Sequence, residues 1–173
     1  MSDWEDIYHC PVCEVDNCVP PNNLESSVLI VGEEPEGDDE IQGMPLVGRT
    51  GTILRQMLAR MDWDLSSFGV CNLWQHKPNK NEECLAHGKQ VVVKSAKGKK
   101  VVLLIGSDVA KEFLTKNISE LNGMKVNDYL KIPLSAPVVM AMMNPAVVFH
   151  NVHGEIVLAL QNFIREVEKI DDK

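Results

Sequence analysis

The chain has 173 residues, of which 45% are hydrophobic, and its formal net charge is −8. This length suits one compact domain with a single core, so we expect residues 1–173 to form one domain and to act as a monomer. No apolar run reaches the roughly 18 residues of a membrane helix, and "MSDWEDIYHC" lacks an apolar signal core, so we expect a soluble, cytoplasmic protein with no membrane contact.

Cysteines are concentrated near the N-terminus, in a segment that we place at residues 1–26. Three of the five cysteines lie there, and an odd number in an intracellular chain argues against a disulfide framework. The stretch "CPVC" indicates a metal or cluster site instead. The five are Cys10, Cys13, Cys18, Cys71 and Cys84.

Four short apolar stretches predict buried strands. Each is apolar on both faces, as expected for the strands of a parallel sheet that is covered on two sides. They are "SVLIVG" (27–32), "FGVCNLW" (68–74), "KVVLLIG" (100–106) and "APVVMAMM" (136–143).

Helical patterns alternate with these strands. They cover residues 51–61, 81–94, 107–117 and 154–170, although "QVVV" within the second could also be read as a strand, and Ser107 is the expected N-cap of the third. The alternation predicts an α/β fold with a central four-stranded parallel sheet between helices. Binding sites in such sheets form at the carboxyl ends of the strands.

An acidic loop leaves the carboxyl end of the first predicted strand. It holds six acids between residues 33 and 40, and it could bind a divalent cation, supply one catalytic carboxylate or simply be solvated. Glu33 and Glu34 follow the strand directly, whereas we expect residues 38–40 to be solvated. Gly48 and Gly51 precede the next helix, where backbone donors can meet an anion.

Lysines cluster between residues 77 and 100, in contrast to the negative charge of the whole chain. Seven of the 17 basic residues lie in this interval, against two acids. The interval could form a basic, nucleic-acid-binding face or an ordinary solvated surface. The net charge itself argues against non-specific attraction to nucleic acid.

The stretch "VGEEPEGDDEIQGMPLVGRTGTIL" resembles the motif G-E-[AG]-P-G-x-x-E-D-x-x-G-x-P-F-V-G-x-A-G-x-L-L of the family 4 uracil-DNA glycosylases, without a gap. Four further stretches resemble that family in the same order. They are "GVCNLWQHKP", "KKVVLLIGSDVAKEFL", "ISELNG" and "NPAVVFHN".

This resemblance implies a DNA glycosylase that hydrolyses the N-glycosidic bond of uracil, or of a related modified pyrimidine, flipped out of single- or double-stranded DNA. It implies that Glu33 positions water or stabilises the sugar cation. Glu34 stands where family 4 has a small residue and family 1 a catalytic aspartate. Asn72 is implied to read the base edge, beside Gly32, although a strand-end cap is its alternative role.

Three positions depart from the family pattern. Leu46 replaces the phenylalanine that stacks on uracil, and Asn144 replaces a histidine that stabilises the leaving base. His150 replaces an arginine of the DNA-inserting loop. We therefore expect Asn144 to donate to a base carbonyl, and Gly48, Gly51 and His150 to contact DNA.

The cysteines follow the same pattern of match and departure. Cys10, Cys13 and Cys84 match three cluster cysteines of the family, and His76 stands at the fourth position, with Cys18 as the alternative ligand. The resemblance implies a [4Fe-4S] cluster, whereas three cysteines and one histidine would equally suit zinc. Cys71 lies inside a predicted strand and is expected to be a buried thiol.

Two further functions compete with the glycosylase. The changes at Leu46 and Asn144 favour a catalytically weakened member that binds DNA as an accessory protein. The acidic loop, taken alone, would also suit a metal-dependent enzyme.

Overall fold

The structure, a computed structural model, describes residues 10–11, 18–79, 81–150 and 153–171. Its centre is one sheet of four strands. They are β1 (Val28–Gly32), β2 (Gly69–Asn72), β3 (Val101–Ile105) and β4 (Val138–Met142). The order across the sheet is β2-β1-β3-β4, and every neighbouring pair is parallel, which confirms the predicted sheet.

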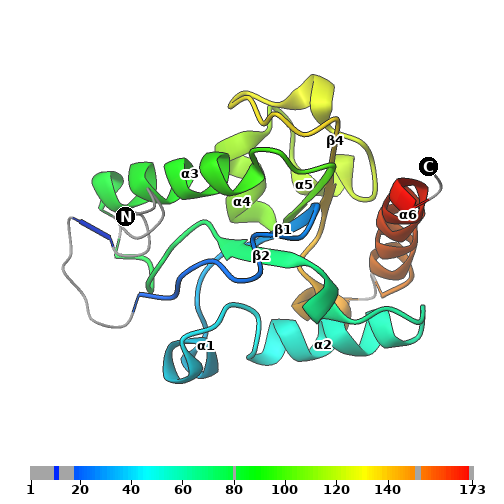
Figure 1. Cartoon of the computed structure of the whole chain (residues 1–173), viewed down its shortest axis with the longest axis horizontal. Helices are drawn as coiled ribbons and strands as arrows, with labels where there is room; N and C mark the ends of the chain where they lie inside the picture. Colours follow the sequence, from blue (N-terminus) through cyan, green and yellow to red (C-terminus); the bar gives the residue numbers. More distant parts are fainter. Residues whose placement is uncertain (1–9, 12–17, 80, 151–152, 172–173) are drawn as a thin grey trace.

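Helices cover both faces of this sheet (Figure 1). One face packs against α3 (Glu82–Ala96), α4 (Ser107–Phe113) and α5 (Ile118–Leu121), and the other against α2 (Arg49–Ala59) and α6 (His153–Asp171). Alternate residues of each strand supply the two cores: Leu29 and Val31 lie in the first, Val28 and Ile30 in the second. The three-layer α/β prediction is therefore confirmed.

The predicted elements are present with small shifts at their ends. The helix predicted from residue 51 begins at Arg49, and the one predicted to reach residue 117 ends at Phe113. The segment containing "QVVV" is helical: Val91 and Val92 are buried, whereas Gln90, Val93 and Lys94 of the same helix are exposed.

Two short helices and one cap differ from the sequence prediction. The first helix, α1 (Gly37–Gln42), occupies what we predicted to be an irregular loop, and α5 lies where no element was predicted. Ser107 is the first helical residue of α4 rather than its N-cap. The cap is Gly106, whose φ of +99° lies in the left-handed region that favours glycine.

Short 3-10 helices complete the fold at Leu65–Ser67, Asn127–Tyr129 and Pro145–His150. The last of these connects the carboxyl end of β4 to α6. None of the helices in the described part of the chain is both long and apolar enough to cross a membrane.

Candidate functional site

A cavity of about 320 Å³ opens at the carboxyl edge of the sheet. Its lining comes from the end of β1 and the segment after it, from Ile105 at the end of β3 and from the segment after β4. This fits a site at the carboxyl ends of the strands, although no residue of the segment after β2 is part of the lining. Helix α2 closes a further side through Arg49 and Thr50. The other lining residues are Gly32, Glu33, Glu34, Glu36, Leu46, Ile105, Asn144 and Ala146.

Glu33 is held in this cavity by two hydrogen bonds. The Asn144 side-chain amide donates to Glu33 Oε1 at 2.9 Å, and the Asp108 backbone N–H donates to Glu33 Oε2 at 3.0 Å. Partial burial raises the pKa of the Glu33 carboxyl above its usual value of 4.5, although the two hydrogen bonds oppose this shift. Each carboxylate oxygen still has a lone pair that can accept from a water molecule or a ligand.

Gly106 makes room for that carboxylate. A Cβ atom at Gly106 would overlap with the side chain of Glu33, so the left-handed glycine is required both by the backbone and by the site. Glu34, the next residue, is exposed and also lines the cavity. Two neighbouring carboxylates with different environments therefore face the same space.

Both polar atoms of the Asn144 side-chain amide form hydrogen bonds with other residues of the protein. Its Nδ2 donates to Glu33, and its Oδ1 accepts from the Ala146 backbone N–H at 2.9 Å. This pair of bonds fixes the orientation of the amide. One hydrogen on Nδ2 remains available to a ligand, because a primary amide nitrogen carries two.

Asn72, at the end of β2, is paired with Gly32 of β1 and is not itself among the residues that line the cavity. A Cβ atom at Gly32 would lie 2.6 Å from Asn72 Oδ1, so a side chain at position 32 would press against this amide. Only 1% of Asn72 is exposed, and neither its Nδ2 nor its Oδ1 has a hydrogen-bond partner among the described residues. Buried amides without partners are rare, and a ligand that offers both a donor and an acceptor would satisfy this one.

Leu46 covers the same region from the other side. Its side chain is 5% exposed, and its Cδ2 would lie 3.6 Å from a Cβ atom at Gly32. The Leu46 backbone has a φ of +57°, and its carbonyl oxygen approaches α2 so closely that a Cβ atom at Gly51 would overlap with it. Leu46 therefore lines the cavity next to Gly32.

The expectation that residues 38–40 are solvated is wrong for Asp39, which is 1% exposed. Its carboxylate accepts backbone N–H groups from Val47 at 2.8 Å and Gly48 at 2.9 Å. It also accepts the N–H of Glu36 at 3.0 Å. These three hydrogen bonds stabilise the buried charge and fold the acidic loop onto the segment that carries Leu46.

Glu36 acts in a similar way at the start of α2. Its two carboxylate oxygens accept the backbone N–H groups of Arg49 at 2.8 Å and Thr50 at 3.1 Å. The donors near Gly48 and Gly51, which we expected to meet a DNA phosphate, are therefore already paired with carboxylates of the same chain. The sequence offered one signal of this, the spacing Glu36-x-x-Asp39, which forms a capping box.

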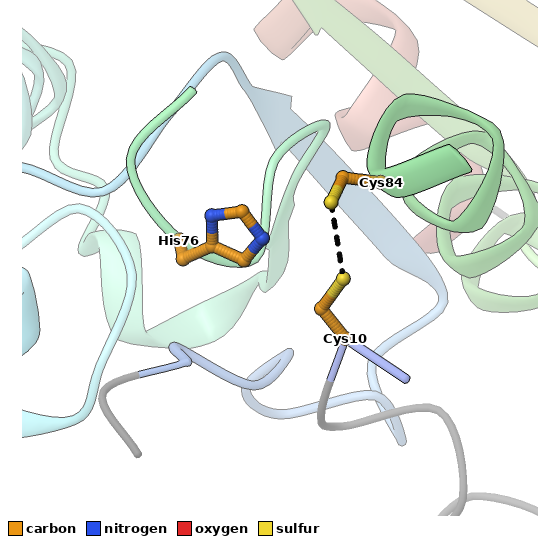
Figure 2. A group of neighbouring side chains, drawn as sticks. All are labelled: Cys10, His76 and Cys84. Carbon is orange, nitrogen blue, oxygen red and sulfur yellow. Dashed lines mark hydrogen bonds between the residues drawn. The ribbon is translucent and has the colours of Figure 1, made fainter. Parts of the chain in front are cut away.

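A second group of polar residues lies beyond β2, where Cys10, His76 and Cys84 converge from three separate segments (Figure 2). One ligand atom from each lies within 4.8 Å of the others, and all three residues are buried. The Cys10 thiol donates to Cys84 Sγ at 3.5 Å, and Cys18 Sγ accepts the Cys10 backbone N–H at 3.4 Å. Four of the five cysteine and histidine ligands that we considered are thus neighbours.

The donor set of this group fits a metal centre. Nδ1 of His76 lies 2.8 Å from the Lys77 carbonyl oxygen, and Figure 2 shows a ring nitrogen turned toward the two sulfur atoms. A backbone partner of this kind commonly fixes the orientation of a ligating imidazole. Thiolate and imidazole ligands suit zinc or an iron-sulfur cluster.

Three residues remain from the sequence prediction. Two of them cannot be compared with it, and the third, Cys71, is buried as predicted. Cys13 lies outside the described residues, and so does the side chain of His150. Cys71 is fully buried among core residues, and burial raises the pKa of its thiol to about 12, which makes it an unreactive thiol at neutral pH.

The fold and the cavity together define a parallel α/β protein with acids and amides at the carboxyl edge of its sheet. The sequence profile of the uracil DNA glycosylase superfamily matches residues 21–167, and the chain belongs to this superfamily. A type-4 uracil-DNA glycosylase from Archaeoglobus fulgidus is 29% identical over 83 residues. That alignment covers 45% of this chain and 42% of the relative, so the chain spans less than half of the relative's length.

Proposed function

We propose that this protein is a monofunctional DNA glycosylase of base excision repair that removes uracil or a related modified pyrimidine from DNA. The observation that carries the proposal is the buried Asn72 amide, whose two polar atoms have no partner among the described residues and which lies beside Gly32 of an acid-lined cavity. A flipped pyrimidine presents one donor and one acceptor on its Watson–Crick edge, and these would satisfy both ends of the amide.

The cavity offers the groups that such a hydrolysis requires. Cleavage of the bond between the base nitrogen and the sugar C1′ leaves the electron pair on the base and a positive charge on the sugar. Glu33 stabilises this cation through space, while Glu34 accepts a proton from the water that adds to C1′. The second Nδ2 hydrogen of Asn144 donates to a carbonyl of the leaving base.

A catalytically weakened, DNA-binding accessory protein is the second candidate. The observation that favours it is the amide at position 144, which cannot carry a charge and already gives one hydrogen to Glu33. Leu46 adds to this, because base stacking on an aromatic ring is worth about 1–3 kcal/mol and a leucine supplies no ring. The acidic-loop enzyme is less well supported, since the carboxylates of Glu36 and Asp39 are used by backbone N–H groups.

For the metal centre we propose that Cys10, His76 and Cys84, with Cys13 or Cys18, hold a [4Fe-4S] cluster, with zinc as the alternative. The resemblance of Cys10, Cys13 and Cys84 to the cluster cysteines of the family 4 motif supports the cluster. The convergence of Cys10, His76 and Cys84 supports a bound metal. The group would act structurally, because none of Cys10, His76 and Cys84 is among the residues that line the cavity.

A single-turnover assay with enzyme in excess tests the glycosylase proposal. Single- and double-stranded oligonucleotides that contain uracil or another modified pyrimidine are incubated with wild-type protein, Glu33→Gln, Glu34→Gln and Asn72→Ala, and abasic sites are counted. We expect abasic product from the wild type and a loss of about 10² or more in rate for at least one glutamate variant. Asp38→Asn, an exposed acid of the same loop, is the matched control.

The outcomes separate the two candidates. Wild-type protein that binds DNA without forming abasic sites from any of these substrates would leave only the accessory function. Full activity in both glutamate variants would refute the assignment of Glu33 and Glu34.

A further inference from the structure

A second cavity lies beside the first, between α4 and α5. Its volume is about 390 Å³, and its polar lining comes from two helices and the segment after the 3-10 helix at Asn127–Tyr129. Backbone pairing fixes this segment, because the Thr115 N–H donates to the Tyr129 carbonyl and the Lys131 N–H to the Phe113 carbonyl. The residues used below are Ser107, Lys111, Thr115, Lys116, Asn117 and Lys131.

The groove is basic, although the whole chain carries a net charge of −8. Lys111, Lys116 and Lys131 are exposed and line it, and no acid does. Among the described residues, none of these three lysines forms a salt bridge with a carboxylate. Lys116 Nζ lies 5.1 Å from the centre of the Tyr129 ring, a cation–π contact that holds the charge at the groove.

Two of the nearby acids are engaged elsewhere. Glu112, which follows Lys111, pairs with Lys89 at 2.7 Å on the other side of α4. Glu120 accepts the Asn117 backbone N–H at 3.3 Å within the capping box of α5. The positive charge of the groove is therefore not neutralised by these two neighbouring carboxylates.

Part of the lysine-rich interval of residues 77–100 is used within the fold. Lys99 is buried and donates to backbone carbonyls of Leu24 and Ser26, and Lys89 is paired with Glu112. Two of the seven lysines are thus used inside the fold. The groove beside α4 is better placed than that interval to meet a polyanion.

The position of the groove ties it to the proposed site. Ser107 lines one end, and the next residue, Asp108, donates its N–H to Glu33. From there the groove follows α4, whose seven residues span about 10 Å. A strand carries one negative charge at each backbone phosphate, so a lysine-lined stretch of this length can meet a short run of consecutive phosphates.

We propose that this lysine groove binds backbone phosphates of the DNA strand next to the flipped nucleotide. The inference rests on the proposed function, because it takes the occupant of the first cavity to be a base attached to DNA. Lys111, Lys116 and Lys131 supply the positive charge, and Ser107, Thr115 and Asn117 supply neutral donors. Phosphate contacts of this kind raise affinity for any sequence and do not select the base.

The test uses binding of a labelled single-stranded oligonucleotide without uracil, so that binding is measured apart from chemistry. The variant is Lys111→Gln/Lys131→Gln. The control is Lys94→Gln/Lys97→Gln, which removes two exposed lysines at the end of α3, next to the amino end of β3. Dissociation constants are measured over a range of salt concentrations, and thermal unfolding confirms that both variants fold.

We expect the groove variant to bind more weakly than the wild type. Each phosphate contact with a single strand contributes about 0.7 to the slope of log K against log salt, so the loss of two contacts should lower the magnitude of that slope by about 1.4. The control should keep the slope of the wild type. An unchanged slope in the groove variant would overturn the proposal, and so would an equal fall in the control.

The chemical step separates this proposal from the proposed function. At subsaturating DNA, the groove variant should form abasic sites more slowly than the wild type, because its lysines bind the substrate strand. The control Lys94→Gln/Lys97→Gln should form them at the rate of the wild type. If the groove variant has a reduced slope but the wild type forms no abasic sites, the phosphate-binding groove is supported and the glycosylase function is refuted. If the wild type forms abasic sites and the groove variant keeps the slope of the wild type, the glycosylase is supported and the groove is refuted. A wild type that binds no DNA would refute both the glycosylase and the groove.

Discussion

Glu33 has the most distinctive environment of any acid in the cavity. Because its pKa in the folded protein is raised above 4.5, the fold favours its protonated form. The stability gained from protonated Glu33 is fully present below pH 4.5 and is lost as the pH rises through the folded-state pKa. Catalysis by the ionised carboxylate would increase over the same interval.

This predicts a pH-dependent difference in stability between wild-type protein and Glu33→Gln. Glutamine does not titrate, so the melting temperature of the variant minus that of the wild type should grow as the pH rises from about 4 towards 7 and should then level off. Thermal unfolding at a series of pH values measures this difference. A difference that stays constant across the series would show that the pKa of Glu33 is not raised.

Some site residues were predictable because they directly follow strands. Glu33 and Asn72 come at the ends of β1 and β2, and the rule that parallel strands gather their carboxyl ends places them together. Asp39 was not predictable in this way. Its burial depends on N–H groups of Val47 and Gly48, and these become its neighbours only after the loop folds back on itself.

The contact between α2 and the Leu46 segment depends on a glycine. In an ordinary helix, Gly51→Ala would be stabilising by up to about 1 kcal/mol. Here the new Cβ atom would overlap with the Leu46 carbonyl oxygen. We expect the substitution to destabilise the protein by about 1–3 kcal/mol, as overpacking commonly does, and to move Leu46 relative to Asn72.

Gly37→Ala is the matched control for this substitution. Gly37 lies in α1, and a Cβ atom there would meet no atom within 4 Å. Urea unfolding of both variants gives the comparison, and the control should equal or slightly exceed the wild type in stability. Equal effects of the two substitutions would show that the approach of α2 to Leu46 is not close.

The start of α4 shows why one cap prediction was wrong. Serine is a good N-cap, and Ser107 precedes an amphipathic run. The chain uses Gly106 instead, because the carboxylate of Glu33 occupies the space that a side chain would need there. The long helices and the strands were predictable from periodicity, whereas α1 and α5 are too short for a periodic pattern to develop.

The proposed metal centre connects parts of the chain that are far apart in sequence. Cys10 and Cys84 are 74 residues apart, and His76 follows β2. We expect Cys84→Ser to lower the metal content of the purified protein and its melting temperature, because closing a long loop restricts the unfolded chain. Elemental analysis, visible absorption and thermal unfolding measure these effects.

Cys71→Ala is the control for metal content, since Cys71 lies in the core apart from the group of cysteines and histidine. It should lose stability through the small cavity that it creates but keep its metal. Visible absorption that depends on Cys84 would indicate the iron-sulfur cluster, and zinc in a colourless protein would indicate the alternative. Equal metal content in wild type and Cys84→Ser would refute the centre.

The charge of the whole chain was a poor guide to its local surfaces. A net charge of −8 argued against attraction to nucleic acid, yet part of it belongs to carboxylates that accept backbone N–H groups, such as Glu36 and Asp39. The groove beside α4 is basic all the same. The composition gives only the net charge, whereas the fold shows which charged side chains lie together on the surface.

The hydrogen bonds of Glu36 and Asp39 make residues 36–51 a nearly self-sufficient unit. The carboxylates of Glu36 and Asp39 accept five hydrogen bonds from backbone N–H groups of the same segment, which tie its two ends together. Residues 36–51 could therefore be exchanged as one segment between related proteins. Relatives could then differ in the side chain at position 46 while these hydrogen bonds keep the backbone of the segment in the same conformation.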